Sequence, residues 1–461
     1  MPLVLGIDSS TQSSKAVLVD ADEGVVVDEW TAPHPAGTEV DPRAWLTAVD
    51  TVAAPLLDRA AALAVGGQQH GMVALDAAGE PVRPALLWND TRSAAAAVQL
   101  IEEYGGPQAC AEAIGSVLVA SFTVTKLRWL RDHEPEHAAR VEQVLLPHDY
   151  VSAHVAAPGT RAFTDRGDAS GTGYFDATAD TWRHDLLEAA LGHDAHLPEV
   201  VAPGAVAGST TSSQVIGAGT GDNMAAALGM ALRPGDVLLS IGTSGVASTV
   251  SRAAAVDGTG TVTGFADATG GFLPMVTTMN AARILDLQAA LLGVDHDELA
   301  ALALQAPAGA NGVTISPYYG GERTPNRPDA TGTWTGLRPT TTRADLARAA
   351  YEALLCSLAD AADLLAEHTP EPVERVLLVG GAARSAAVRV LAPAILGRPV
   401  VVPPPGEYVA LGAARQAAWA LAGTADPPDW PERGAELLEA EPTPDVRARY
   451  TELRHRTTDW S

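Results

Sequence analysis

The sequence predicts an α/β fold of two related domains that flank an active-site cleft. Two strand, turn, strand segments carry this prediction, one at 3–20 (LVLGIDSSTQSSKAVLVD) and one at 236–250 (DVLLSIGTSGVASTV). A similar unit near the start of each half of the chain indicates two domains of similar build. A chain of 461 residues, 47% of them hydrophobic, has the length of two or three domains, and we expect two.

Strands and helices alternate through both halves, as α/β proteins require. In the first half we expect a helix near 43–62, a strand over ALAVGGQQ (62–69), and helices near 91–104 and 124–133. In the second half we expect Asn280 to cap a helix that ends before Gly293, and Thr342 with Asp345 to form a capping box for a helix reaching about His368. A buried strand over 373–381 then runs into glycine and a helix.

The domain boundary is expected near 232–234, where a helical run meets Arg-Pro-Gly. The first domain is then 1–231 and the second 232–421. The proline-rich segment 422–461 is expected to be a peripheral C-terminal tail with little chemistry.

Charge and cysteine content exclude several classes of protein. A formal charge of −26 repels nucleic-acid phosphates and anionic membrane surfaces, so neither is expected as a partner. The two cysteines, Cys110 and Cys356, are far apart in sequence, which favours a reducing compartment over a disulfide framework. We find no signal-peptide pattern and no long apolar run, and therefore expect a cytoplasmic protein.

Two turns and one strand end are candidates for binding phosphate or nucleotide, because small residues let backbone N–H groups approach an anion. These candidates are Asp8, Thr11 and Lys15 in the first turn, Gly242, Thr243 and Ser244 in the second, and Gly380 and Gly381 after the strand. By itself each turn is more typical of an ordinary hairpin. A dinucleotide-binding fold is disfavoured, because the chain lacks G-x-G-x-x-G in the required setting.

Polar residues at strand and loop ends are candidates for the substrate site. Asp222 in GTGDN (219–223) precedes a helix, so it could be a catalytic carboxylate or an N-cap. GGQQHG (66–71) could contact a ligand or form a plain turn. LLWNDTRS (86–93) and YYGGERTPNRP (318–328) fit ligand contact and a salt-bridge network equally well.

Taken together, these segments resemble the FGGY family of carbohydrate kinases. Residues 121–133 (SFTVTKLRWLRDH), with Lys126 and Trp129, follow one family signature, and residues 332–352 follow the other. The resemblance extends from Leu3 to about Trp419. It implies two ribonuclease H-like domains related to actin and hexokinase, with sugar bound mainly by the first and ATP by the second.

The resemblance also implies roles for single residues. Asp222 aligns with the family's catalytic base, and Asp8 would hold Mg2+ through water. Gln69, His70, Asn223 and Trp88 would contact the sugar, and Gly412 would join Gly380 and Gly381 around adenosine.

Within the family, residues 68–71 (QQHG) resemble the members that phosphorylate D-xylulose, and the segments 145–151, 164–172 and 320–325 favour the same substrate. Two departures are Gln69, where many such members have Met, and Ser10, where Gly is usual. The alternatives are another ketose, polyol or sugar acid, such as ribulose, fuculose or gluconate, and a non-catalytic, actin-like ATP-binding sugar sensor. The sequence leaves the oligomeric state open, with a homodimer among the options.

Overall fold

The computed structural model describes residues 1–431 and 433–460, which form two compact units. The first unit takes Met1–Leu232, Arg252–Leu273 and Gly406–Pro431, and the second takes Arg233–Ser251, Pro274–Pro405 and the described residues after 432. The first break lies next to the expected boundary. Unlike the expected domains, however, the units are discontinuous, and the described part of the expected tail is shared between them. Residues 432 and 461 of that tail lie outside the described residues.

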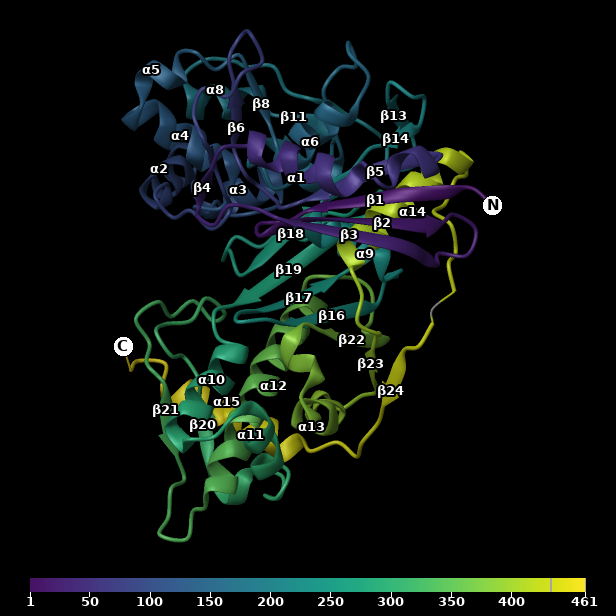
Figure 1. The fold of residues 1–461 in the computed structure, drawn as a ribbon. Coiled ribbons are helices and arrows are strands. Elements are labelled where there is room, and N and C mark those ends of the chain that lie inside the picture. The colour runs from purple at the N-terminus through teal and green to yellow at the C-terminus, as the bar shows by residue number, and fades with distance from the viewer. Residues whose placement is uncertain (432, 461) are drawn as a thin grey trace. The chain divides into compact units, whose positions relative to one another are not determined.

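The first unit is built on a sheet whose strands run in the order β13-β14-β5-β1-β2-β3 (Figure 1). Its strands are β1 (Leu3–Ser9), β2 (Ser13–Asp20), β3 (Val26–Pro33), β5 (Ala62–Gly67), β13 (Val206–Ser209) and β14 (Val215–Gly217), with β15 (Thr220–Gly221) paired to β5. β1, β2 and β3 are antiparallel neighbours, whereas β5 is parallel to β1 and β14 to β5.

Helices and short strands complete the first unit. The helices are α1 (Arg43–Ala53), α2 (Ala94–Glu103), α3 (Pro107–Ile114), α4 (Thr123–His133), α5 (Pro135–Ala138), α6 (Pro147–Val155), α7 (Arg166–Ala169), α8 (His184–Leu191), α9 (Asp222–Gly229) and α14 (Tyr408–Ala422). The short strands are β4 (Glu39–Val40), β6 (Val73–Leu75), β7 (Ala85–Leu86), β8 (Gln143–Leu145), β9 (Phe163–Thr164), β10 (Phe175–Asp176), β11 (Thr181–Trp182), β12 (Glu199–Val200) and β18 (Val262–Ala266).

Alternation along β1 places core on both faces of this sheet. Leu5 and Ile7 pack with α1 residues on one face, and Val4 packs with α14 residues on the other. Gly6 shares the α14 face, where a Cβ would collide with the carbonyl oxygen of Ala410. A side chain at position 6 would therefore keep α14 from lying against β1.

The second unit has a sheet of similar order, β19-β17-β16-β22-β23-β24. Its strands are β16 (Asp236–Ile241), β17 (Gly245–Thr249), β19 (Phe272–Thr278), β22 (Arg375–Val379), β23 (Val400–Val402) and β24 (Glu436–Leu438), with β20 (Thr314–Ser316) and β21 (Thr333–Thr335) apart from it. The helices are α10 (Ala282–Leu292), α11 (His296–Ala303), α12 (Arg343–Glu367), α13 (Ala386–Leu396) and α15 (Pro444–Arg456). As in the first unit, an antiparallel meander is followed by parallel strands.

Most expected elements are present, and two differ. The expected helix over 43–62 ends at Ala53, because Pro55 has no backbone N–H to continue the helical hydrogen bonds, and only a short 3-10 turn, Leu57–Arg59, follows. Asn280 does not cap α10: Ala281 is the N-cap, and the Asn280 amide donates to the Gly321 carbonyl and the Glu322 carboxylate. The capping box of Thr342 and Asp345 is confirmed.

In the part of the chain that the structure describes, no helix is both long and apolar enough to cross a bilayer.

Candidate active site

Polar segments of the first unit meet at one edge of its sheet. β1 and β5 are parallel, with Asp8 opposite Gly66, and β15 places Gly221 opposite Gly67. Strands β1 and β5 therefore end beside each other, next to β15. This topology brings together Asp8, the segment 66–71 and the segment 219–223, which are far apart in sequence.

Asp222 is the first residue of α9, and the N-cap is Gly221. The N-cap interpretation of Asp222 therefore does not hold. Its Oδ1 accepts hydrogen bonds from the backbone N–H of Asn223 (2.8 Å) and from Asn223 Nδ2 (3.0 Å). Burial, together with the charges of Asp8 and Asp168, raises the pKa of Asp222 to about 7. This carboxylate can accept a proton near neutral pH.

Asp8 is almost fully buried at the end of β1, with 2% of its surface exposed. Burial raises its pKa to about 6, an effect opposed by the Ser10 hydroxyl and the Lys15 charge and reinforced by Glu407. The Ser10 hydroxyl lies 2.6 Å from both carboxylate oxygens. Ser10, the departure from glycine, thus has a partner in this turn.

Gln69 and Asn223 connect the two loops, because Asn223 Nδ2 donates to Gln69 Oε1 at 2.6 Å. Among the described residues, Gln69 Nε2 has no hydrogen-bond partner, although the side chain is buried. His70 has a left-handed backbone, with φ of 62°. Its ring stacks on Phe265 and meets Phe122 edge-on, with centroids 5.2 Å apart in both pairs.

The other two candidates of the first turn, Thr11 and Lys15, interact with side chains outside the turn. Trp88 is half exposed, and its Nε1 donates to Thr11 Oγ1 at 2.9 Å. Lys15 Nζ pairs with Glu407, the N-cap of α14, at 2.5 Å. Thr11 and Trp88 therefore lie together, whereas Lys15 is directed to the start of α14.

In the second unit, the exposed turn of Gly242, Thr243 and Ser244 joins β16 to β17. Gly380, with φ of 94°, follows β22 directly and begins a 3-10 turn, Gly381–Arg384. A Cβ on Gly380 would lie 2.6 Å from the carbonyl oxygen of Ile241, so β16 could not pass so close to any other residue.

Between these segments lies a cavity of about 390 Å³. It is lined by Ile241, Gly242, Thr243, Ala282, Leu285, Asp286, His296, Asp297, Tyr351, Gly381, Ala382, Arg384 and Ser385. Tyr351 and Ser385 are hydrogen-bonded through their hydroxyls at 3.1 Å. Tyr351 lies inside the long helix α12 and within the signature segment 332–352, but no local pattern distinguishes it as a cavity residue.

Gly412 is not in the unit that holds Gly380 and Gly381. It lies in α14 of the first unit, where a Cβ would collide with the Ala225 carbonyl oxygen of α9. Close packing of α14 on α9 accounts for this glycine.

The polar segments 86–93 and 318–328 carry ion pairs and backbone contacts. Arg92 pairs with Asp90 (2.8 Å) and Glu39 (2.7 Å), as in a salt-bridge network within the first unit. Glu322 is buried in the second unit and accepts the backbone N–H of Met279 at 2.5 Å.

A buried cluster of titratable side chains lies beneath the first-unit site, and the sequence assigned it no role. His148 Nδ1 lies 2.7 Å from Asp168 Oδ2, and both side chains are fully buried. The sequence signals were a His-Asp pair inside the apolar segment 145–151 and two aspartates in the polar segment 164–172.

A proton-accepting carboxylate beside amide side chains in one unit, and a glycine-lined cavity in the other, are the parts of a kinase for a small hydroxyl substrate. Models of the FGGY family of carbohydrate kinases match the chain, the N-terminal domain over residues 3–229 and the C-terminal domain over 237–421.

Known proteins agree with this match. The chain is 47% identical over 437 residues to a xylulose kinase of Streptomyces coelicolor, covering 92% of this chain and 89% of that protein. It is 45% identical to one of Streptomyces rubiginosus, covering 95% and 93%. The crystal structure of xylulose kinase from Bifidobacterium adolescentis superposes with a TM-score of 0.92 at 44% identity, covering 98% and 99%.

The chain belongs to the FGGY family of carbohydrate kinases. It is an ATP-dependent sugar kinase, and the predicted fold of two ribonuclease H-like domains is confirmed.

Proposed function

We propose that this enzyme transfers the γ-phosphoryl group of ATP to D-xylulose and forms D-xylulose 5-phosphate. Relatives that carry the name xylulose kinase cover nearly the whole chain at 45% identity and above. The observation that carries the proposal is Asp222, a carboxylate with a pKa near 7 next to the polar side chains of Gln69 and Asn223.

In this proposal Asp222 is the general base. It accepts the proton of the attacking sugar hydroxyl as the bond to phosphorus forms. A carboxylate with an ordinary pKa would be a weaker base, and the burial and neighbouring charges that raise the pKa of Asp222 improve the match.

The sugar is assigned to Gln69, His70, Asn223 and Trp88. Gln69 Nε2 is a buried donor without a partner among the described residues, so a sugar hydroxyl would satisfy it. Trp88 presents a half-exposed ring of the kind that packs against a sugar face.

The nucleotide is assigned to the second unit. Gly242, Thr243 and Gly381 line its cavity, which at about 390 Å³ is within the usual range for small-molecule sites. Ser244 belongs to the same turn, 242–244, which is assigned to the phosphates. Gly380 allows the strand β16 to pass close to it just before that turn. On the first unit, Thr11 and Lys15 are the candidates for the phosphate. Gly412, which the family resemblance assigns to the adenosine site, packs in α14 against α9, and this packing is the role that its contacts support.

Mg2+ is proposed as the cofactor, which would neutralise charge on the phosphates. Asp8 suits such an ion, because its buried carboxylate lies near Asp222 with little compensating positive charge. Mg2+ sites typically use one or two carboxylates together with water and substrate phosphates. Among the described residues no group of three or more potential metal ligands gathers.

The test is ADP release by the purified enzyme with D-xylulose, D-ribulose, L-fuculose, gluconate and glycerol. We expect the highest kcat/KM with D-xylulose. A higher value for another sugar would replace the substrate, and ATP turnover with none of them would leave the sugar-sensor interpretation. Gln69 is the reason to include ribulose, because its extra donor and acceptor can change which hydroxyl pattern fits.

A cytoplasmic location is part of the proposal, and the two free, buried cysteines suit a reducing compartment. Light scattering during size-exclusion chromatography would distinguish a homodimer from a monomer.

A further inference from the structure

His70 has a backbone conformation that few residues other than glycine adopt. Its φ of 62° lies in the left-handed region, so neighbouring groups must hold it there. Thr123 Oγ1 donates to the His70 carbonyl oxygen at 3.2 Å, and the ring packs between Phe122 and Phe265. Gly171 leaves the space for that ring, because a Cβ at position 171 would collide with it.

The backbone N–H of His70 has a charged partner. It faces the carboxylate of Asp168, a fully buried residue of α7, and this contact opposes the rise in the pKa of that carboxylate that burial causes. The same carboxylate lies 2.7 Å from His148 Nδ1. Asp168 thus connects the predicted sugar segment to His148 of α6.

The ring of His148 also supports both loops of the site. A Cβ on Gly67 would lie 2.9 Å from His148 Cβ, and a Cβ on Gly219 would lie 2.8 Å from His148 Cδ2. Gly67 directly precedes Gln68, and Gly219 directly precedes Thr220. His148 therefore packs beneath the points where the two loops leave the sheet.

Other carboxylates face this pair. Asp149 Oδ1 lies 3.2 Å from His148 Nε2, and Asp165 accepts the Thr220 hydroxyl at 2.7 Å. Burial works against a charged imidazole, but Asp149, Asp168 and Asp165 together raise the pKa of His148 to about 9. The imidazolium is then the positive centre of a fully buried cluster.

We propose that Asp168 and His148 are positioning residues that hold His70 and the loop 219–223 in the geometry that binds the sugar. This inference rests on the proposed function for the identity of the sugar. The inference goes beyond the proposed function because it assigns part of the affinity for the sugar to two residues outside the set assigned to sugar contact.

Replacement of Asp168 separates positioning from mere stability. Asp168→Ala removes the carboxylate that faces the His70 N–H and accepts from His148, and we expect the KM for D-xylulose to rise about tenfold or more while the KM for ATP changes less than about twofold. Asp168→Asn keeps the size of the side chain and an oxygen that can face His70 and accept from His148, so we expect it to restore most of the sugar affinity. Steady-state kinetics with each substrate varied in turn measures both.

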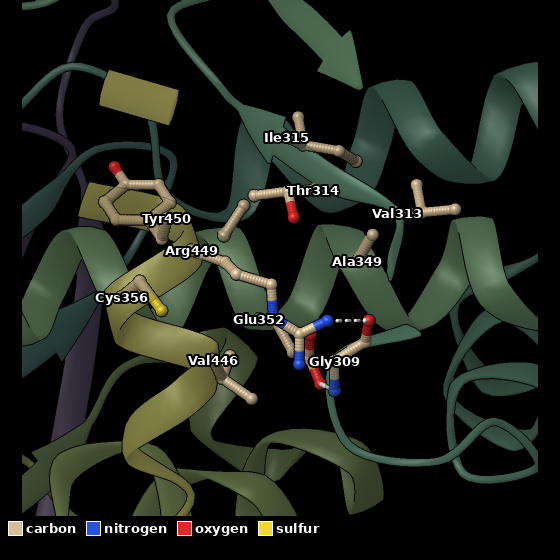
Figure 2. Close-up of a pocket in the computed structure, with 11 residues that line it drawn as sticks. Gly309, Val313, Thr314, Ile315, Ala349, Glu352, Cys356, Val446, Arg449 and Tyr450 are labelled. Atoms are coloured by element: carbon tan, nitrogen blue, oxygen red, sulfur yellow. Dashed lines mark hydrogen bonds between the residues drawn. The ribbon is translucent and has the colours of Figure 1, made fainter. Parts of the chain in front are cut away.

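The second unit offers a matched control (Figure 2). Glu352, 5% exposed, accepts the backbone N–H of Gly309 at 2.8 Å, as Figure 2 shows. It also pairs with Arg348 at 2.7 Å, so it is a buried carboxylate paired with a basic side chain, as Asp168 is with His148. We expect Glu352→Ala to lower the thermal midpoint and to leave the KM for D-xylulose unchanged.

A second variant covers the case in which Asp168→Ala does not fold because it removes the hydrogen-bond partner of the buried His148 Nδ1. Gly171→Ala displaces the His70 ring without removing a charge. It should raise the sugar KM in the same direction, again with the ATP KM nearly unchanged.

Hydrogen exchange of the intact protein reads the same positioning without turnover. We expect faster exchange in the peptide covering 66–71 for Asp168→Ala and Gly171→Ala, and wild-type exchange there for Asp168→Asn and Glu352→Ala. The inference is overturned if Asp168→Ala and Gly171→Ala leave both sugar KM and exchange unchanged, or if Glu352→Ala changes them equally. Failure of the proposed function would instead appear in the wild-type enzyme, as a preference for another sugar, and would leave the exchange comparison intact.

Discussion

Asp222 carries its charge next to two other carboxylates, Asp8 and Asp168. A buried acid whose pKa is raised on folding costs stability at neutral pH, because folding then opposes its ionisation. Such a cost is common where a group is kept for catalysis.

We therefore predict opposite effects of Asp222→Asn on activity and stability. Loss of the general base should lower kcat by about 10² to 10⁴. The thermal midpoint should rise by about 1–4 °C, because one member of a cluster of like charges is removed. Kinetics and calorimetry on the same preparation test this, and a variant retaining more than about a tenth of wild-type kcat would contradict the assigned role.

The pH dependence provides an independent test of the same residue. A protonated carboxylate cannot accept the sugar proton, so kcat/KM should fall as pH drops through the pKa of Asp222, about 7. Since the charge of Asp8 raises that pKa, Asp8→Asn should move the acid limb to lower pH, whatever it does to the maximal rate. A profile from about pH 5 to 9 measures it, and an unmoved limb would place the titrating group elsewhere.

Single residues differ in how far the sequence could predict them. Asp222 could be found because glycines and a helix start surround it, but its raised pKa depends on burial and on the charges of Asp8 and Asp168, which are distant in sequence. The left-handed backbone of His70 could not be read from its neighbours either, because it depends on contacts with residues near 122 and 168.

At the scale of elements, α14 is held close to α9 by glycines on both helices. A Cβ on Gly412 would collide with the Ala225 carbonyl oxygen, and one on Gly229 with that of Tyr408. Such contacts leave no room for a methyl group, because packed interiors yield little.

We predict that Gly412→Ala destabilises the enzyme although alanine is the better helix former. The gain in helix propensity is about 1 kcal/mol, whereas forcing a methyl group against backbone typically costs ~1–3 kcal/mol or more. The thermal midpoint should fall. Gly381→Ala is the control, because a Cβ there meets nothing within 4 Å, and its thermal midpoint should stay near that of the wild type.

Local patterns predicted the elements well where interactions between residues close in sequence determine the conformation. Both hairpins and the capping box of α12 are present because alternation and caps act over a few residues. Asn280 was wrongly expected to cap α10, because a partner at Glu322, in a distant loop, competes for its amide. Tertiary partners of this kind leave no local trace.

At the scale of the molecule, the proposal divides the substrates between the two units. We predict that D-xylulose alone slows amide exchange in 66–71 and 219–223, and that the non-hydrolysable analogue of ATP alone slows it in 242–245 and 380–385. Hydrogen exchange with mass spectrometry measures both, and the segment 310–316 serves as a reference that neither ligand should affect. Protection of the first pair of segments by the nucleotide alone would contradict the division.

The repeated hairpin correctly indicated two domains of one build. The first unit gains 252–273 and 406–431 from the second half of the chain. Sequence order suggests continuous domains. Only the packing in space shows that α14 covers one face of the sheet that contains β1 and β5.

This late origin of α14 has a consequence for synthesis on the ribosome. The face of β1 that carries Val4, and that of β5 that carries Ala62 and Ala64, lack their covering helix until residues beyond Gly406 have emerged. At about 5–20 residues per second, that delay is on the order of 10 s after the preceding part of the unit has been made. The nascent first unit is therefore expected to wait with an apolar sheet face uncovered, and to depend on chaperones for protection from aggregation.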